Sequence, residues 1–250
     1  MIREQRLVFG EDPELYDRIR PTYPEALFDD VADLVSSKGR VVDVGCGTGK
    51  ATGALARRIA SGVGVEADPA MASWCAQHLT MFPGWRVDVS EFERWQQAAD
   101  QYELVTCAQA WHWLTPGERE ARAHAVLRPG GVLAVWWSRT DAARSPLKGD
   151  LDELYSELAP SMTHRAYGPD EVPAPDLWPG FGTPKVKDYR WTQRYTAEEW
   201  ADLMRSSSEH RMLGQESREV LLARVAEVID RHGGSFDHPY CTTLWVARRL

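Results

Sequence analysis

Apolar positions repeat with two alternating spacings along the first half of the chain, which predicts strands that alternate with helices. Residues 24–37 place Leu27, Val31 and Leu34 on one helical face. Arg40–Val44 reads RVVDV, an apolar β-branched run typical of a buried parallel strand. The next predicted elements are a helix at 51–60, a strand at 62–66, a helix at 69–79, a strand at 85–89, a short helix, a strand at 102–108, a helix at 116–126 and a strand at 131–137. This order indicates an α/β fold with a doubly wound, mostly parallel sheet covered by helices on both faces.

The regular alternation stops after residue 137. A helix is predicted at 147–158, and the segment that follows it is rich in proline, with Pro160, Pro169, Pro173, Pro175, Pro179 and Pro184. A long irregular segment inside a compact domain is usually functional. We therefore interpret 140–184 as an insertion after the fifth strand that forms a lid or a binding loop, with a poorly ordered segment as the alternative.

Regular structure is predicted again from residue 185. The predicted elements are a strand at 185–191, a helix at 196–206, a helix at 217–232 and a strand at 240–248. Thr196 is the expected N-cap of its helix, and Glu199 completes a capping box with it. The helix at 217–232 is expected to pack on the sheet through one face, which carries Leu221, Val225, Val228 and His232.

The composition fits one globular domain, because 43% of the 250 residues are hydrophobic and 26% are charged. We divide this single domain, 1–250, into four parts: an N-terminal helical cap (1–38), a core (39–139), the insertion (140–184) and the C-terminal strands and helices (185–250). The four cysteines match no metal-ligand spacing, so we interpret them as reduced packing residues and expect no metal site.

The charge pattern excludes several classes of partner. A net charge of −8 leaves no positive field to attract a phosphate backbone, so we expect no nucleic-acid partner. No apolar run reaches the roughly 18 residues that a spanning helix needs, so we expect no membrane partner. The first twenty residues are rich in charge and lack the apolar stretch of a signal peptide, which favours a cytoplasmic location. Nothing in the pattern indicates an oligomeric state.

A glycine-rich turn, VGCGTGK, lies between the first predicted strand of the sheet and the helix that follows. Glycine allows the backbone to approach a ligand closely at such a turn. A P-loop is disfavoured, because Val44 stands where its first glycine belongs and Ala51 where its magnesium-binding hydroxyl belongs. A dinucleotide fingerprint is disfavoured as well, because Lys50 occupies the position of its third glycine.

The remaining pattern is GxGxG with an acidic residue in each of two successive strands, Asp43 and Glu66. It resembles the S-adenosylmethionine (SAM) site of class I methyltransferases. The resemblance implies that the turn lies against the methionine part of SAM, that Glu66 holds the ribose hydroxyls, and that the loop after the third strand binds adenine. Asp43 would serve the SAM amino group through water or bind backbone N–H groups nearby. The cofactor-binding residues expected on this basis are Asp43, Gly45, Cys46, Gly47, Gly49, Glu66, Ala67, Ser90, Glu91, Phe92 and Gln109.

Two further segments carry a closer resemblance. Residues 109–114, QAWHWL, are similar to the AQAxHW stretch of a methyltransferase subgroup that includes trans-aconitate methyltransferase-like proteins. Residues 16–24, YDRIRPTYP, resemble the YDxxRPxYP segment of the same group. The resemblance implies a Rossmann-like methyltransferase fold, seven strands with the last one antiparallel, and a small-molecule substrate. After methyl transfer, SAM would be converted to S-adenosylhomocysteine.

The segment at 109–114 follows the fourth strand, at the edge where open α/β sheets bind ligands. His112 is a candidate general base for O- or N-methylation, with a structural hydrogen-bonding role as the alternative. Trp111, Trp113 and Tyr16 are expected to line the pocket through cation–π or planar contacts, or else to belong to the core. Arg20 is expected to bind a carboxylate of SAM or of the substrate, with an ion pair to Asp17 as the alternative.

Two other functions remain open at this stage. A nicotinamide- or flavin-dependent oxidoreductase can be built on a similar sheet. A non-catalytic SAM-binding protein would keep the same turn and the same acidic residues without any transfer chemistry.

Overall fold

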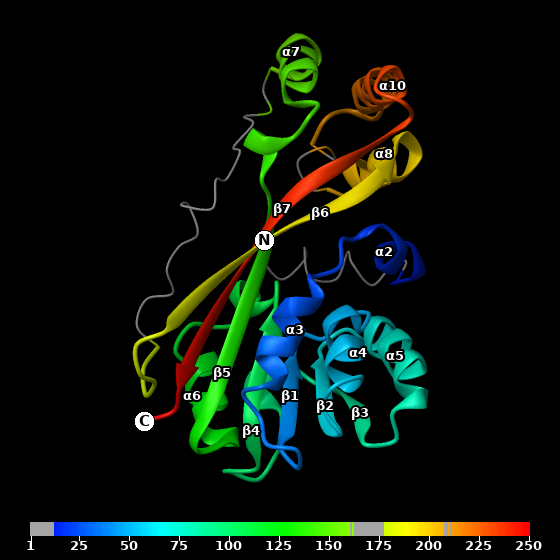
Figure 1. The fold of residues 1–250 in the computed structure, drawn as a ribbon. Helices are drawn as coiled ribbons and strands as arrows, with labels where there is room; N and C mark the ends of the chain where they lie inside the picture. Colours follow the sequence, from blue (N-terminus) through cyan, green and yellow to red (C-terminus); the bar gives the residue numbers. More distant parts are fainter. Residues whose placement is uncertain (1–12, 161, 163–177, 208–209, 211) are drawn as a thin grey trace.

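A computed structural model describes residues 13–160, 162, 178–207, 210 and 212–250, which form one seven-stranded sheet with helices around it (Figure 1). The strands are β1 (Arg40–Val44), β2 (Ser61–Glu66), β3 (Trp85–Val89), β4 (Tyr102–Ala108), β5 (Leu127–Thr140), β6 (Lys185–Thr196) and β7 (Ser235–Arg248). Their order in the sheet is β3-β2-β1-β4-β5-β7-β6, with β1 to β5 parallel and β7 antiparallel to both of its neighbours. The predicted doubly wound, mostly parallel sheet is therefore confirmed.

Two hydrophobic clusters cover the two faces of the sheet. One contains side chains of α3 (Glu25–Ala32), α4 (Lys50–Ala56) and α5 (Pro69–His78), and the other contains side chains of α6 (Glu118–Val126) and of the 3-10 turn η3 (Phe92–Arg94). Burial of apolar surface on both faces explains why the central strands read as almost continuous hydrophobic runs.

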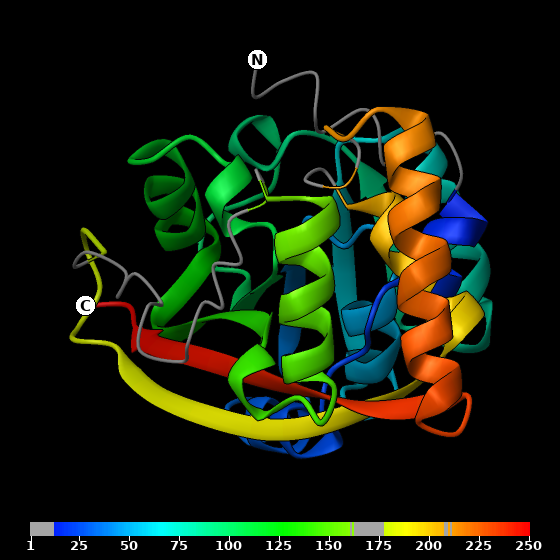
Figure 2. The ribbon, with the colours of Figure 1, turned by 90° about the horizontal axis from the view of Figure 1, so that it is seen from above.

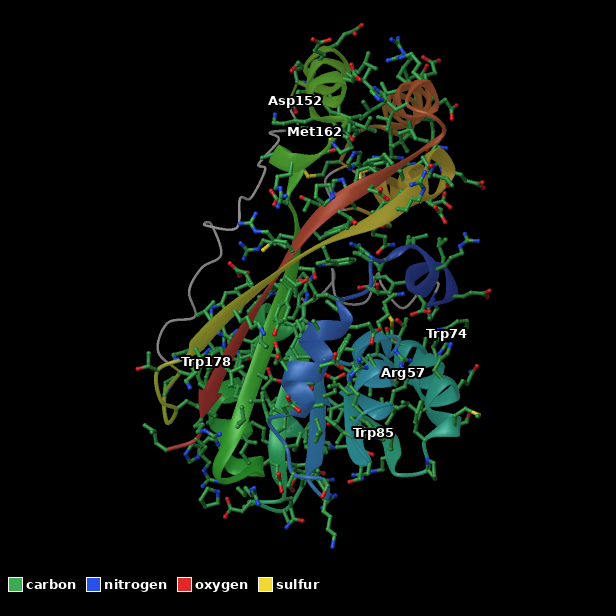
Figure 3. The ribbon with its side chains drawn as sticks, in the orientation of Figure 1. Arg57, Trp74, Trp85, Asp152, Met162 and Trp178 are labelled. Atoms are coloured by element: carbon green, nitrogen blue, oxygen red, sulfur yellow. The ribbon has the colours of Figure 1, made fainter. Side chains whose placement is uncertain are left out.

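Trp85 and Trp178, both labelled in Figure 3, are buried in the clusters on opposite faces of the sheet. Trp85 of β3 donates its indole N–H to the Ile59 carbonyl at 2.8 Å, and its ring leaves no room for a side chain at Gly62. Trp178 is buried in the cluster on the α6 face. It is the first described residue after 163–177, so most of the proline-rich part of the predicted insertion lies outside the described residues.

The last three strands extend beyond the parallel core. Ala108 at the end of β4 pairs with Trp136, and β5 continues for four more residues to Thr140. On these extensions a third cluster forms, in which α7 (Lys148–Leu158), α8 (Ala197–Ser206) and α10 (Gln215–Arg231) pack together; Figure 2 shows α7 and α10 side by side. The N-terminal α2 (Pro13–Ile19) contacts both α5 and α8. Helix α2 and the third cluster therefore cover the carboxyl edge of the parallel strands.

The prediction for the helix at 217–232 was partly wrong. Leu221, Val225 and Val228 of α10 are buried, but they pack mainly against α8 and α7 rather than on the central sheet. His232 lies outside this packed face, is exposed, and interacts with Asp150 of α7 at 2.7 Å. The periodicity identified the apolar face correctly, but it carries no information about which element covers that face.

The start of α8 confirms the predicted capping box. The Thr196 hydroxyl accepts a hydrogen bond from the Glu199 amide at 3.2 Å, and the Glu199 carboxylate accepts one from the Thr196 amide at 2.9 Å. Replacement of Thr196 with alanine is expected to lower the free energy of unfolding by about 1 kcal/mol. Urea unfolding measures the loss, with Thr192→Ala, at an exposed position of β6, as the matched control. Equal effects of the two substitutions would contradict a capping role.

None of the helices within the described part of the chain combines the length and the apolar character that crossing a membrane requires.

Candidate active site

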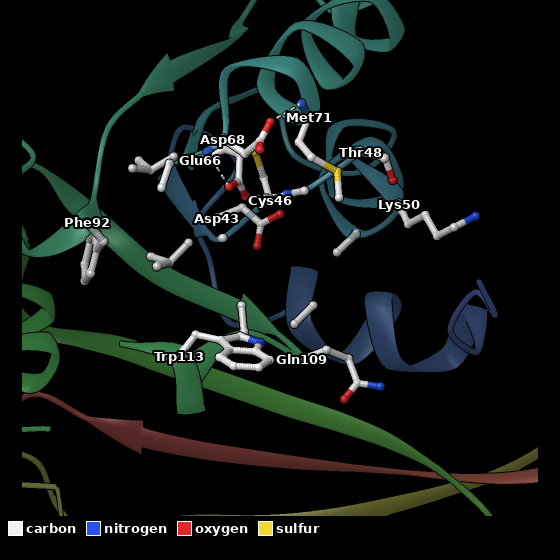
Figure 4. A pocket seen from close by; sticks show the side chains of 18 of the residues that line it. Asp43, Cys46, Thr48, Lys50, Glu66, Asp68, Met71, Phe92, Gln109 and Trp113 are labelled. Atoms are coloured by element: carbon white, nitrogen blue, oxygen red, sulfur yellow. Dashed lines mark hydrogen bonds between the residues drawn. The ribbon is translucent and has the colours of Figure 1, made fainter. Parts of the chain in front are cut away.

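A cavity of about 360 Å³ lies at the carboxyl edge of β1, β2 and β4, beneath α2 (Figure 4). Asp43 and Glu66 lie on one side of it, and Gln109 and Trp113 lie on the opposite side. Most of the residues predicted from the sequence line this cavity: Tyr16, Arg20, Asp43, Gly45, Cys46, Gly47, Glu66, Ala67, Ser90, Phe92, Gln109 and His112. The volume falls within the range of small-molecule sites.

The glycine-rich turn uses its backbone N–H groups inside the protein. The amides of Gly45 and Cys46 both donate to the Val65 carbonyl, at 2.8 and 3.3 Å, and the amide of Gly47 donates to the Glu66 carboxylate at 2.9 Å. Gly45 and Gly47 have φ values of +64° and +54°, a left-handed conformation that favours glycine. The turn is thus folded back onto β2, and these three amides are not free to receive a phosphate group.

Glu66 connects the two loops that border the cavity. One carboxylate oxygen accepts the Gly47 amide at 2.9 Å, and the other accepts the Asp68 amide at 2.9 Å. Each oxygen retains a second lone pair, so the same carboxylate can also accept hydroxyl donors from a ligand. Asp68 in turn caps α5 by accepting the amides of Ala70 and Met71. The hydrogen bonds from the Gly47 and Asp68 amides hold the Glu66 carboxylate in one orientation.

Asp43 is a buried carboxylate at the centre of the cavity wall, with 1% of its surface exposed. It accepts hydrogen bonds from the hydroxyls of Thr52, at 2.6 Å, and Thr106, at 2.8 Å. The backbone N–H partners considered in the sequence analysis are therefore replaced by side-chain hydroxyls. Burial raises the pKa of Asp43 to about 6, although both hydroxyls oppose the shift and the nearby charge of Glu66 adds to it. The carboxylate is ionised near neutral pH but poorly solvated, so a cation would be a favourable neighbour.

The charges around the cavity fit SAM better than a nucleotide phosphate. Asp43, Glu66 and Asp68 make one wall acidic, and the amides of the glycine-rich turn are already bonded within the protein. SAM carries a sulfonium and an ammonium group, and it offers a ribose diol in place of a phosphate chain. A rigid acidic wall with a positioned carboxylate suits such a ligand, whereas a pyrophosphate would face repulsion. The residues present therefore fit SAM.

Helix α2 brings Tyr16 to the cavity, and Arg20 follows directly after the end of this helix. Asp17 of this helix accepts the Thr48 hydroxyl at 2.8 Å and lies 3.5 Å from the Lys50 ammonium, which ties α2 to the glycine-rich turn. The Arg20 guanidinium lies 5.3 Å from the centre of the Tyr16 ring. Burial is the largest cause of the raised pKa of Tyr16, so its phenol stays protonated near neutral pH.

Three predicted site residues do not line the cavity. Gly49 begins α4 as its N-cap, with a φ of +94°, and has Cys75 as its close neighbour. Glu91 forms an ion pair with Arg94 at 3.2 Å, while its neighbours Ser90 and Phe92 face the cavity.

Trp111 is the third, and its placement corrects the prediction of a catalytic or pocket role. Only 2% of its surface is exposed, and its ring centre lies 6.2 Å from that of Trp178 in the core. The turn at 111–113 is a 3-10 helix, so residues two apart point in different directions. Trp113 consequently lines the cavity while Trp111 packs inward.

His112 lies at the cavity mouth between two tryptophans. Its ring centre is 4.6 Å from that of Trp113, and its Nδ1 accepts the indole N–H of Trp137 at 3.3 Å. Partial loss of hydration, together with the positive charge of Arg119, lowers the pKa of His112 below its ordinary value. His112 is therefore neutral at physiological pH.

Gln109 adopts an unusual backbone conformation, with a φ of +59°. Outside glycine such values are uncommon and often mark functional positions. Its amide donates to the Trp136 carbonyl at 2.9 Å, and its side-chain amide donates to the Ser138 carbonyl at 2.9 Å. Gln109 thus fastens the loop after β4 to the neighbouring strand β5.

Several residues in or beside the cavity were not predicted from the sequence. Tyr23 lies within the recognised segment 16–24, so the resemblance could have pointed to it. Met71 lies in the first turn of α5, directly after the acidic loop, and no sequence signal marked it. Trp137 was assigned only to a strand, and its contact with His112 depends on the pairing of β4 with β5. Within the ranges that the structure covers, no group of three or more His, Cys, Asp or Glu side chains is placed to hold a metal ion.

Comparisons with known proteins agree with this geometry. A family model described as a methyltransferase domain matches residues 41–131, which run from β1 into β5. An uncharacterized methyltransferase of Mycobacterium tuberculosis is 29% identical over 92% of this chain and 88% of its own length. The trans-aconitate 2-methyltransferase of Variovorax paradoxus is 35% identical over 38% of this chain and 37% of its own length. A solved structure from Anaeromyxobacter dehalogenans, assigned as a type II methyltransferase, has the same fold, with a TM-score of 0.69 at 19% identity over 92% of this chain and 97% of that chain.

Proposed function

Because the chain is a class I SAM-dependent methyltransferase, we propose that it transfers the methyl group to a small-molecule acceptor, on an oxygen or a nitrogen atom. The observation that carries this proposal is the acidic wall of the cavity. Glu66 is fixed by two backbone amides beside the glycine-rich turn, and Asp43 is buried next to it. This wall supports a cationic nucleoside as the ligand and disfavours a pyrophosphate beside the carboxylates.

The residues on the acidic side would hold the cofactor. Glu66 has lone pairs available for the ribose hydroxyls, and Phe92 offers an apolar surface near the end of β3 for the adenine. Asp43 would face the positively charged part of the ligand. When bound, SAM supplies the activated methyl group on its sulfonium.

The residues on the opposite side would hold the acceptor. His112, Trp113 and Tyr16 border the mouth of the cavity, and Arg20 provides a cation that can bind an acidic group of either ligand. Methyl transfer is an in-line displacement, so positioning of donor and acceptor accounts for much of the rate; fixed geometry supplies about 7–11 kcal/mol in favourable cases. Helix α2 and the loop 109–113 form walls from two separate parts of the chain, which suits this task.

A small acceptor accords with the size of the cavity and with one of the relatives. The matching protein of Variovorax paradoxus is named for a small acid, trans-aconitate, although the match covers 38% of this chain. The cavity of about 360 Å³ is lined by aromatic side chains and by an acidic wall, and the net charge of the chain is −8. Both features favour a small metabolite over RNA as the acceptor.

Ligand-induced stabilisation tests the cofactor assignment. At a SAM concentration of about one hundred times its Kd, binding is expected to stabilise the fold by about 2.7 kcal/mol, which corresponds to an increase in Tm of about 5–10 °C for a chain of this size. Differential scanning fluorimetry with SAM, S-adenosylhomocysteine, NADH and FAD separates the candidates. A shift with NADH or FAD and none with SAM would instead favour the oxidoreductase.

The acceptor can then be identified by labelling. Purified protein incubated with a metabolite extract and SAM carrying a radiolabelled methyl group is expected to yield a labelled small molecule, which mass spectrometry identifies. SAM binding without any labelled product across several extracts would favour a binding protein without transferase activity.

A further inference from the structure

The contact between Trp137 and His112 determines which imidazole nitrogen carries the proton. The indole Nε1 can only donate, and it lies 3.3 Å from Nδ1 of His112. Nδ1 must then be the unprotonated, accepting nitrogen, so the neutral ring bears its proton on Nε2. We propose that Trp137 holds His112 as the Nε2–H tautomer, and that His112 donates a hydrogen bond to the methyl acceptor instead of acting as its general base. The second half of this proposal rests on the proposed function, and the first half does not.

The surroundings of Trp137 keep the indole in place. Gln109 bonds to the carbonyls of Trp136 and Ser138, the residues on either side of Trp137 in β5, at 2.9 Å each. Trp245 of the neighbouring strand β7 packs against the Trp137 ring edge to face, with ring centres 5.1 Å apart. Gln109 and His112 belong to the same short loop. The two hydrogen bonds of Gln109 therefore fix the His112 loop relative to Trp137, and with it the position of the imidazole relative to the indole N–H. The left-handed backbone of Gln109 is the local strain that these two hydrogen bonds require.

This arrangement changes the chemistry available at His112. A general base needs a free lone pair, and the lone pair of Nδ1 is occupied by the indole N–H. Nε2 carries a proton in the neutral ring and also in the imidazolium, so it offers a donor in both states. In the transfer, the bond from the acceptor atom to the methyl carbon forms as the carbon–sulfur bond breaks, and the electron pair of that bond remains on the sulfide. No proton passes to His112, so the acceptor atom must enter the site as a carboxylate or another oxyanion, or as a neutral amine nitrogen whose surplus proton is released to water after the transfer.

The tautomer can be measured on the protein without any ligand. Long-range ¹⁵N–¹H spectra of protein labelled at histidine distinguish a protonated ring nitrogen from an unprotonated one, and the His112 signals are identified by their loss in His112→Gln. In the unsubstituted protein at pH 8, we expect Nε2 to be protonated and Nδ1 to be unprotonated. In Trp137→Phe we expect the ratio of the two tautomers to move toward the mixture seen for free histidine.

Trp113→Phe is the matched control, because the Trp113 ring lies against the same imidazole, with ring centres 4.6 Å apart, through a ring contact and not through a hydrogen bond. The tautomer should remain unchanged in this variant. A protonated Nδ1 in the unsubstituted protein, or a tautomer ratio that is the same with and without Trp137→Phe, would overturn the role of Trp137. Neither result depends on SAM or on the acceptor, so it would leave the proposed function standing.

The activity of two variants tests the role of His112 as a donor. The glutamine amide can place an N–H close to the position of Nε2, so His112→Gln should retain methylation of the extract-derived acceptor within about tenfold of the unsubstituted rate. His112→Ala should lose about 10- to 100-fold, mostly in kcat. If His112 were a general base, both variants would lose methylation rate to the same extent, by about 10²- to 10⁴-fold. Equal large losses would therefore overturn the donor role, while SAM binding measured by calorimetry shows that the cofactor site is intact.

Discussion

Replacement of Glu66 with glutamine is expected to raise the Kd for SAM by about 100- to 1000-fold. A hydrogen bond to a charged group contributes about 1.5–3 kcal/mol, and the carboxylate offers acceptors for two ribose hydroxyls. The substitution also puts an NH₂ group where an oxygen now accepts the amide of Gly47 or of Asp68, each at 2.9 Å. Two donors would then face each other, so the loop after β1 or the loop after β2 loses its attachment. The loss of affinity therefore combines a missing contact with a less ordered site.

Isothermal titration calorimetry with SAM and S-adenosylhomocysteine measures this effect. Both ligands contain the ribose, so both affinities should fall by a similar factor. Glu91→Gln is the matched control, because Glu91 is a nearby carboxylate that pairs with Arg94 and does not line the cavity. A Kd within threefold of the unsubstituted protein for Glu66→Gln would remove the basis for placing the ribose at this residue.

The central sheet could be predicted from the sequence because its strands are buried on both faces. β1, β3 and β4 have the predicted bounds, Arg40–Val44, Trp85–Val89 and Tyr102–Ala108. The predictions were too short for β5, β6 and β7. β5 continues through Ser138 to Thr140, and β6 continues from Trp191 to Thr196. The extensions of β5 and β6 read SRT and TQRYT and carry mostly polar residues, so hydrophobicity gives no sign of them.

One side of the candidate site could be predicted from the sequence, and the other side could not. The acidic side follows from local sequence, because a glycine-rich turn after one strand and a carboxylate ending the next must meet at the carboxyl edge of a parallel sheet. The opposite side depends on contacts between distant segments. Trp137 reaches His112 only because β4 and β5 pair in one register. Trp111 and Trp113 had the same expectation, but one packs in the core and the other lines the cavity because the turn that holds them is a 3-10 helix. Spacing along the chain does not determine either outcome.

Asp43→Asn is expected to stabilise the ligand-free protein at pH 8 by about 3 kcal/mol and to have little effect near pH 4. The pKa of Asp43 is about 6 in the folded protein, against an ordinary value of 3.8. A raised pKa means that the folded state disfavours the ionised form. Ionisation of Asp43 therefore does not lower the free energy of unfolding below pH 3.8. The loss of stability grows as the pH rises to about 6 and is constant above that value, where it amounts to about 3 kcal/mol. The amide carries no charge, so the variant avoids this loss of stability.

The hydroxyls around Asp43 can accommodate the amide. Thr106 lies 3.2 Å from the Val42 carbonyl as well as 2.8 Å from Asp43, so its one proton can turn to the carbonyl while its oxygen accepts the new N–H. Thr52 can continue to donate to the remaining oxygen. Urea unfolding at pH 4.5 and pH 8 measures the difference in stability, with Asp33→Asn as the exposed control, for which a change within about 0.5 kcal/mol is expected at both pH values. A variant less stable than the unsubstituted protein at pH 8 would contradict a desolvated charge at this position.

The same substitution should weaken SAM binding while it strengthens the fold. The buried carboxylate destabilises the ligand-free protein. A bound cation stabilises the ionised carboxylate, so part of the affinity for the cation comes from removal of this destabilisation. SAM carries the sulfonium charge, whereas S-adenosylhomocysteine does not. If Asp43 complements the sulfonium, Asp43→Asn lowers the affinity for SAM by about tenfold more than the affinity for S-adenosylhomocysteine, a difference of about 1.4 kcal/mol. Equal losses for the two ligands would assign Asp43 to the ammonium group they share, and unchanged affinity for both would leave the buried charge without a role in binding.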